Sequence, residues 1–271
     1  MIAGASSVSG TTTAPGLPAG YERFREGRAE VVALAAAAGP VREALRDAEG
    51  VHGADGTLYG YAQRHPRARA MAGRGTAWAV PLPDERTHVV VRRSRHGGLL
   101  APVTGDRFVA PTRAPHELRT AVRLAEAGVR TPQVVAFAVY PAGPLLRRSD
   151  VATREVMRGR DLAVSLLNPV DAAGRRALLG ATAELLAALA RAGARHPDLN
   201  CKNVLLAPGG AGVQAWVFDV DRVTFGRPGD PRIARANLER LARSARKWRD
   251  LYGAAIDEAD LAWLAGAAAA T

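Results

Sequence analysis

Apolar and polar positions follow two kinds of pattern along the chain. Short runs rich in β-branched and aromatic residues predict strands at 87–91, 134–140, 150–157, 204–206 and 215–218. Longer stretches with apolar residues every three or four positions predict helices at 114–128, 171–192, 231–251 and 256–269. We also expect a helix over 21–45, broken at Gly39-Pro40. The chain thus predicts a mixture of both element types, and no internal repeat is present.

Composition narrows the classes of partner. The 271 residues suit one large or two small domains, and residues 1–19, which are mostly small, polar or Pro, predict a disordered tail. The net charge of +11 favours an anionic partner: a nucleotide, a phosphorylated glycolipid, an anionic membrane surface or nucleic acid. Almost all of this charge is arginine, because Lys202 and Lys247 are the only lysines. No aromatic-basic motif accompanies it, so we do not expect nucleic acid.

Other features of the sequence argue against a disulfide-linked, zinc-binding, membrane-spanning or secreted protein. The single cysteine, Cys201, excludes an internal disulfide and a zinc cluster, and we expect it to be a small buried hydrophobe. No segment approaches the length of a membrane-spanning helix. The N-terminus lacks the basic and apolar parts of a signal peptide, so we expect a cytoplasmic protein.

The strongest chemical signal is the stretch His196-Pro197-Asp198-Leu199-Asn200-Cys201-Lys202-Asn203, which precedes a predicted strand. A second predicted strand follows and ends at Asp219-Val220-Asp221. An Asp and an Asn five residues apart have the spacing of a kinase catalytic loop. Phosphoryl transfer from ATP needs one carboxylate to orient the acceptor hydroxyl, and an Asn and a second carboxylate to hold Mg²⁺. The pattern therefore predicts a kinase.

Each of these residues also has an ordinary structural interpretation. Asp198 and Asn203 could be turn residues, and Asp219 and Asp221 could simply end a strand. All four in this order, separated by two strands, favour catalysis. We expect His196 to pack beneath the loop and support it rather than act as an acid or base.

Candidate nucleotide contacts lie earlier in the chain. Gly73 and Gly75 predict a tight turn between strands and, more weakly, a phosphate-binding loop. Arg92 ends a predicted strand where protein kinases carry a phosphate-binding lysine, and Glu117 begins the next helix. An exposed arginine and a helix-start carboxylate are the alternatives. The segment from Glu155 to Met157 is placed where a kinase backbone contacts adenine.

These motifs resemble the lipopolysaccharide kinases, the family of the 3-deoxy-D-manno-octulosonic acid (Kdo) kinases and core heptose kinases. The resemblance covers residues 57–250. It depends on the loop 196–203, on Asp219-Val220-Asp221-Arg222, on an arginine and double-glycine segment, and on the closing helix. The segment contains Arg92, Arg95, Gly97 and Gly98, and the closing helix contains Leu238, Leu241, Arg243, Ser244 and Lys247.

The resemblance implies an α+β, bilobal protein-kinase-like fold with a small β-rich N-lobe over 20–157, including the preceding helices, and a reduced, mostly helical C-lobe over 158–271. Asp198 would be catalytic, and Asn203, Asp219 and Asp221 would hold Mg²⁺. ATP would be contacted by Arg92, Glu117, Gly73, Gly75, Glu155 and Met157. The acceptor would be contacted by Arg95, Gly97 and Gly98.

The expected activity is ATP-dependent phosphorylation of a sugar hydroxyl, on Kdo of a lipid A precursor. Family membership would also imply peripheral contact with the cytoplasmic face of the inner membrane. Departures from the family pattern are Pro197, Cys201 and Ser94, and the strand lysine is missing. Alternative acceptors are heptose, another small molecule or a protein, although Asn200 argues against a protein. A non-catalytic pseudokinase scaffold is a further alternative.

Overall fold

The computed structural model describes residues 16–50, 56–71, 77–94, 108–109, 111–168, 171–210 and 212–270. They form two compact units that interleave along the sequence. The first contains Met1–Thr87, Val91–Ala110 and Val135–Ala152, and the second contains His88–Val90, Pro111–Val134 and Thr153–Thr271. The domain boundary predicted between 157 and 158 therefore stays a prediction.

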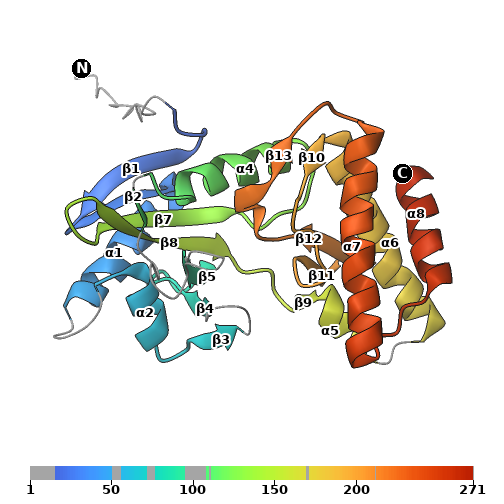
Figure 1. Cartoon of the computed structure of the whole chain (residues 1–271). Coiled ribbons are helices and arrows are strands. Elements are labelled where there is room, and N and C mark those ends of the chain that lie inside the picture. Colours follow the sequence, from blue (N-terminus) through green and yellow to red (C-terminus); the bar gives the residue numbers. More distant parts are fainter. Residues whose placement is uncertain are drawn as a thin grey trace, which may run out of the picture. The chain divides into compact units, whose positions relative to one another are not determined.

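The first unit is built on an eight-stranded sheet with the strand order β1-β2-β7-β8-β5-β4-β3, whose labelled strands can be found in Figure 1. Strand β6 lies off this path and pairs with β8. The starts of β5 and β7 and the end of β8 belong to the second unit. Helix α1 contacts β1 and β2, and α2 contacts β4. The elements are β1 (Tyr21–Glu26), β2 (Ala29–Leu34), η1 (Ala35–Ala37), α1 (Ala38–Glu49), α2 (Leu58–Arg64), β3 (Arg69–Met71), β4 (Ala77–Pro81), β5 (His88–Arg93), β6 (Phe108–Val109), β7 (Val134–Pro141) and β8 (Leu146–Arg154).

The helix predicted over 21–45 is wrong in its first half. The chain forms the antiparallel hairpin β1–β2, which turns at Gly27 with φ of +52°, and only α1 is helical. Arg25 lies directly opposite Glu30, and their side chains are 2.7 Å apart. This pair is five residues apart, a spacing that does not face itself on a helix but fits a two-stranded ribbon. The N-lobe accordingly begins with strands and not with helices.

The second unit is mainly helical, with short strands. Helix α6 packs against α7, α8 and β12, and the three helices lie side by side in Figure 1. The elements are α4 (Ala114–Glu126), β9 (Arg160–Asp161), α5 (Leu162–Leu167), α6 (Ala172–Arg191), β10 (Ala194–Arg195), β11 (Val204–Gly209), β12 (Gly212–Val217), η2 (Val220–Arg222), β13 (Thr224–Phe225), α7 (Pro231–Tyr252) and α8 (Glu258–Ala270).

The helices begin where the sequence supplies caps. Asp171 precedes α6, and its carboxylate accepts a hydrogen bond from the backbone amide of Gly174. Asp230 precedes α7, and its carboxylate accepts one from the backbone amide of Arg232. Helix α7 ends at Tyr252 and is followed by Gly253, whose φ of +71° suits glycine. The four predicted helices from residue 114 onward are confirmed to within a few residues. The strand predicted at 150–157 starts earlier and ends earlier, at 146–154.

Two short sheets position the loops of the second unit. Strand β11 pairs with β12 and β9, and β10 pairs with β13. Gly193, just before β10, has φ of +62°, and a Cβ atom there would lie 2.6 Å from the Gly226 carbonyl oxygen. The α+β class with a sheet-rich first part and a helical second part is confirmed. Among the described residues, no helix is long and apolar enough to span a bilayer.

Candidate active site

The predicted catalytic loop connects β10 to β11 through two turns. The Leu199 amide donates to the His196 carbonyl at 3.2 Å, and the Asn203 amide donates to the Asn200 carbonyl at 2.9 Å. The Asp198 carbonyl oxygen accepts hydrogen bonds from the side-chain amides of Asn200 at 3.0 Å and Asn203 at 2.9 Å. Both asparagines therefore fix the backbone beneath Asp198, and the Asp198 side chain is left partly exposed.

His196 joins this loop to the strand that precedes Asp219. Its side chain lies 2.9 Å, through Nε2, from the Phe218 carbonyl, and its Nδ1 accepts from the Asp198 amide at 3.3 Å. Since Nδ1 accepts, Nε2 carries the proton that the carbonyl receives. Burial lowers the pKa of this imidazole, which is 1% exposed, below its ordinary value. His196 is thus a neutral support, as the sequence predicts.

The open end of the β11–β12 ladder brings Asn203 and Asp219 together. The Phe218 amide donates to the Asn203 carbonyl at 2.9 Å, next to the Val204–Val217 pair. Asp219 follows directly and has a left-handed backbone, with φ of +56° and ψ of +48°. Non-glycine residues in this region are uncommon and concentrate at functional sites. Asp219 is exposed just after the end of β12, and its role as a metal ligand stays a prediction.

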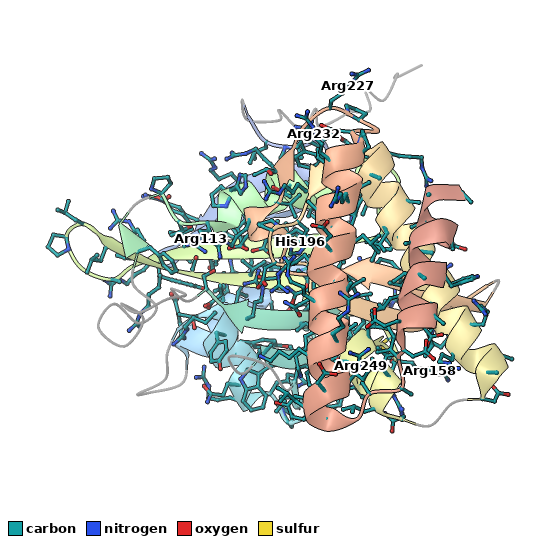
Figure 2. All side chains as sticks on the ribbon, turned by 45° about the vertical axis from the view of Figure 1, so that its right-hand side comes forward. Arg113, Arg158, His196, Arg227, Arg232 and Arg249 are labelled. Carbon is teal, nitrogen blue, oxygen red and sulfur yellow. The ribbon has the colours of Figure 1, made fainter. Side chains whose placement is uncertain are left out.

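Helix α7 holds the catalytic loop through three residues on one face. The buried Asn237 side chain accepts from the His196 amide at 2.9 Å and donates to the Ala194 carbonyl at 2.8 Å. One turn later, Arg240 reaches Asp198, and then Ser244 Oγ accepts from the Cys201 amide at 3.1 Å. Figure 2 shows His196 beside this helix, with Arg232 and Arg249 at opposite ends of it. Helix α7 therefore belongs to the site.

Sequence reasoning missed Asn237 and Arg240. A signal for Asn237 exists, because it lies four residues before Leu241 on the apolar stripe of the helix, where an amide needs a buried partner. Arg240 gives no such signal among the many basic residues of α7. Its Nη2 donates to Asp198 Oδ1 at 2.5 Å, and the two side chains are 29% and 27% exposed. The residue with the closest contact to the predicted catalytic carboxylate was therefore not identifiable from the pattern.

Asp221 has a partner of its own. Arg113, at the start of α4, lies 3.2 Å through Nη1 from Asp221 Oδ2, and the Asp221 side chain is 14% exposed. Helix α4 also contacts η2 through other residues. This ion pair connects α4 to the Asp219–Asp221 segment, so the two carboxylates have different surroundings.

Lys202 and Cys201 complete the loop. The Lys202 ammonium lies 3.8 Å from Asp161 Oδ2 and 5.4 Å from the centre of the Trp248 ring on α7. Cys201 is fully buried, as expected, and burial raises the pKa of its thiol to about 11. A thiol in this state is not a nucleophile at neutral pH.

The predicted nucleotide contacts lie in both units. Arg92 lies on β5 in the first unit, and Glu117 is buried in the first turn of α4 in the second. Their pairing stays a prediction. Glu155 follows β8, where its amide donates to the His88 carbonyl at 3.0 Å, and Met157 is 58% exposed just beyond. Gly73 and Gly75, and the acceptor candidates Arg95, Gly97 and Gly98, lie outside the described residues.

Asn203 and Asp219 are the residues best suited to a metal ion. Across the described parts of the chain, no group of three or more His, Cys, Asp or Glu residues could hold one. Mg²⁺ does not require such a group, because it keeps several waters and binds one or two carboxylates together with substrate phosphates. The Asn203 Nδ2 donates to Asp198, so its Oδ1 is the atom left for a cation. Asp219 is exposed and makes no hydrogen bond or ion pair with any described residue.

Comparisons with known proteins show which family the chain resembles. The profile of the lipopolysaccharide kinase (Kdo/WaaP) family matches residues 62–264. A protein of Xanthomonas oryzae pv. oryzae (strain PXO99A) named 3-deoxy-D-manno-octulosonic acid kinase is 35% identical over 209 residues, which cover 75% of this chain and 80% of that protein. A protein of the same name from Vibrio parahaemolyticus serotype O3:K6 (strain RIMD 2210633) is 28% identical over 200 residues, which cover 69% and 79%.

A solved structure described as WaaP in complex with acyl carrier protein is 22% identical, covers 75% of this chain and 88% of its own, and has a TM-score of 0.44. The family profile spans most of the chain, including the loop 196–203 and the Asp219–Asp221 segment. The 35% identity extends over three quarters of the chain. On these two findings, the chain belongs to the lipopolysaccharide kinase (Kdo/WaaP) family.

Proposed function

We propose that this enzyme transfers the γ-phosphoryl group of ATP to a hydroxyl of Kdo in a lipopolysaccharide precursor. The family supplies the reaction class, a phosphotransferase with a hydroxyl acceptor. The name shared by the relatives supplies the acceptor. The observation that carries the proposal is the hydrogen-bonded link from Asp198 through Asn203 and His196 to Phe218, next to Asp219.

In this proposal Asp198 orients the acceptor hydroxyl and receives its proton. The hydroxyl oxygen forms a bond to the γ-phosphorus, the bond from that phosphorus to the β–γ bridging oxygen breaks, and ADP leaves. Asp198 is suited to this role because Asn200 and Asn203 hold its backbone and its side chain is partly exposed. A positioned base of this kind contributes about 10²- to 10⁴-fold to a rate.

Asn203 Oδ1 and the Asp219 carboxylate would hold Mg²⁺, which neutralises charge on the phosphates when bound. Asp221 is assigned a weaker part, because Arg113 pairs with it. For the nucleotide, we keep Arg92 and Glu117 as the phosphate-side pair, Gly73 and Gly75 as a phosphate loop, and Glu155 and Met157 as the adenine-side segment. Arg95, Gly97 and Gly98 are kept as acceptor contacts.

The test is transfer of labelled phosphate from ATP to a Kdo–lipid A precursor. We expect transfer by the wild-type protein, and a loss of kcat on the order of 10²- to 10⁴-fold in Asp198→Ala with a similar KM for ATP. Asp47→Ala is the matched control, because Asp47 is exposed on α1, far along the chain from the catalytic loop. Absence of transfer, or transfer that survives Asp198→Ala, would contradict the proposal.

A panel of acceptors separates the alternatives. Transfer to a core heptose or to another small molecule in place of Kdo would support the kinase activity and assign it a different acceptor. Magnesium-dependent ATP binding without turnover on any acceptor would indicate a pseudokinase. The requirement for Mg²⁺ is tested by chelation with EDTA, which should stop phosphoryl transfer until excess Mg²⁺ is added.

We also place the enzyme at an anionic lipid surface, as a peripheral protein of the cytoplasmic face of the inner membrane. Helix α7 supports this, because Arg232, Arg235, Arg243 and Lys247 are exposed on it, as are Leu251 and Tyr252 at its end. Co-sedimentation should occur with vesicles that contain phosphatidylglycerol and should fall as salt rises. Equal binding to neutral vesicles would contradict this placement.

A further inference from the structure

Arg240 touches the carboxylate that the proposed mechanism assigns to the acceptor hydroxyl. Its Nη2 donates to Asp198 Oδ1, and both side chains retain more than a quarter of their exposure. The acceptor must approach the Asp198 carboxylate to transfer its proton. Any acceptor that does so comes within reach of the Arg240 guanidinium as well.

The contact of Arg240 differs in kind from the other two contacts that α7 makes with the loop. Asn237 and Ser244 are 1% and 8% exposed, and each satisfies a backbone amide of the loop. These two bonds anchor the loop at both of its ends. Arg240 instead binds a side chain and satisfies no backbone group, so anchoring does not explain why this position carries a cation.

The Arg240 guanidinium has N–H donors beyond the one that binds Asp198. It carries five N–H groups in a planar fork that matches a carboxylate. Only Nη2 has a hydrogen-bond partner among the residues that the structure describes. Lys202, a cation of the loop itself, lies near Asp161 and over the Trp248 ring. Among the described residues, Arg240 is therefore a cation in direct contact with the carboxylate that the acceptor hydroxyl must approach.

The acceptor in the proposed function is a sugar acid, so it brings a carboxylate to this place. We propose that Arg240 is an acceptor-binding residue that holds Asp198 with one arm of its guanidinium and the carboxylate of the sugar acid with the other. This inference rests on the proposed function and deepens it, because it assigns selection of an acidic sugar to a residue of α7. The rival role for the free donors is binding a phosphate of ATP.

The experiment compares two acceptors on four proteins. The acceptors are the Kdo–lipid A precursor and its Kdo methyl ester, which keeps the hydroxyls and removes the negative charge. The proteins are wild type, Arg240→Gln, Arg240→Lys and the control Arg227→Gln, which removes an exposed arginine in the loop before α7. KM and kcat are measured for each acceptor and for ATP, and circular dichroism checks the fold.

We expect Arg240→Gln to raise KM for the acid by at least tenfold and to leave KM for ATP within twofold. The wild-type protein should use the ester with a similarly raised KM, and Arg240→Gln should lower use of the ester no further. Arg240→Lys should recover part of the loss, since it keeps the charge without the fork. Arg227→Gln should behave as wild type.

Three outcomes would overturn the inference. An equal loss on acid and ester would mean that Arg240 acts through Asp198 alone. A raised KM for ATP in place of the acceptor would assign the free donors to a phosphate. Equal use of acid and ester by wild type would exclude a carboxylate contact even if Arg240→Gln does not fold. Failure of wild type to use any Kdo acceptor would instead refute the proposed function, and it would be seen before any variant is assayed.

Discussion

At the scale of single residues, the site depends on side chains that fix backbone. The Asn203 side-chain amide donates to the Asp198 carbonyl. The His196 ring accepts from the Asp198 amide through Nδ1 and donates to the Phe218 carbonyl through Nε2. These roles follow from residue types that the sequence displays, so the loop was recognisable before the fold. Arg240 was not, because nothing in a row of arginines tells which one a distant carboxylate will meet.

His196 predicts a specific dependence of stability on pH. Its folded-state pKa is lowered by burial, so the unfolded chain takes up the proton first as pH falls below about 6.5. The contribution is therefore present above the unfolded pKa and is lost as pH falls toward the folded one. We expect His196→Gln to be less stable at pH 7.5 but to lose less further stability between pH 7.5 and 5.

Urea unfolding at several pH values measures this difference. His116→Gln is the control, because His116 is exposed and should keep the wild-type slope. If the free energy of unfolding falls equally with pH in wild type and His196→Gln, the buried imidazole does not contribute to the loss of stability in acid.

The carboxylates of Asp219 and Asp221 should respond differently to neutralisation. Asp219 is exposed and has no partner among the described residues, whereas Asp221 pairs with Arg113 at 3.2 Å. We expect Asp219→Asn to raise the Mg²⁺ concentration for half-maximal activity by on the order of 10- to 100-fold, the range seen when residues that support a metal site are changed. Asp221→Asn should change it less. The reverse order in a Mg²⁺ titration of kinase activity would reassign the metal to Asp221.

At the scale of elements, α7 is the support of the catalytic loop. Positions 237, 240 and 244 share one face, since residues three and four apart are neighbours on a helix. The sequence predicted the helix and its apolar stripe correctly, because periodicity and caps are local. Its contacts with the loop are made between segments about 40 residues apart in the chain, and no local pattern encodes them.

Asn237 gives a test of this support. Asn237→Ala leaves the buried His196 amide and Ala194 carbonyl without their partner. An unsatisfied buried group costs about 1–3 kcal/mol, so we expect a loss of at least that size in the free energy of unfolding, together with reduced kcat. Gln63→Ala, at an exposed position on α2, should change stability by less than about 0.5 kcal/mol. Equal effects of the two substitutions in urea unfolding would contradict the role given to α7.

The N-terminal hairpin shows where element prediction failed. Residues 21–34 contain Arg, Glu, Ala and Leu, which favour helices, and Tyr21 and Phe24 are three apart as on a helical face. The pairing of Arg25 with Glu30 and the turn at Gly27 outweigh this preference. Local propensity was overridden by pairing of β2 with β7, a strand about 100 residues later.

At the scale of the whole molecule, the α+β class and the order of elements were predictable, and the division into units was not. The first unit takes strands from three stretches of the chain, and α4 belongs to the second unit although it lies between strands of the first. The division depends on contacts between residues far apart in the chain, and a single sequence does not show those contacts. The four residues of the predicted catalytic motif, Asp198, Asn203, Asp219 and Asp221, all lie in the second unit.

The scarcity of lysine makes the protein a good subject for amine chemistry. Beside the N-terminal amine, acylation can occur only at Lys202 and Lys247. Lys247 is exposed, whereas the Lys202 ammonium lies near Asp161 and over the Trp248 ring. We expect an activated ester to label Lys202 more slowly than Lys247, and Trp248→Ala to reduce the difference, as measured by peptide mass spectrometry. Equal labelling of both lysines in wild type would contradict this. If Lys202 is the slower of the two, its labelling rate would report how often its ammonium leaves Asp161 and the Trp248 ring.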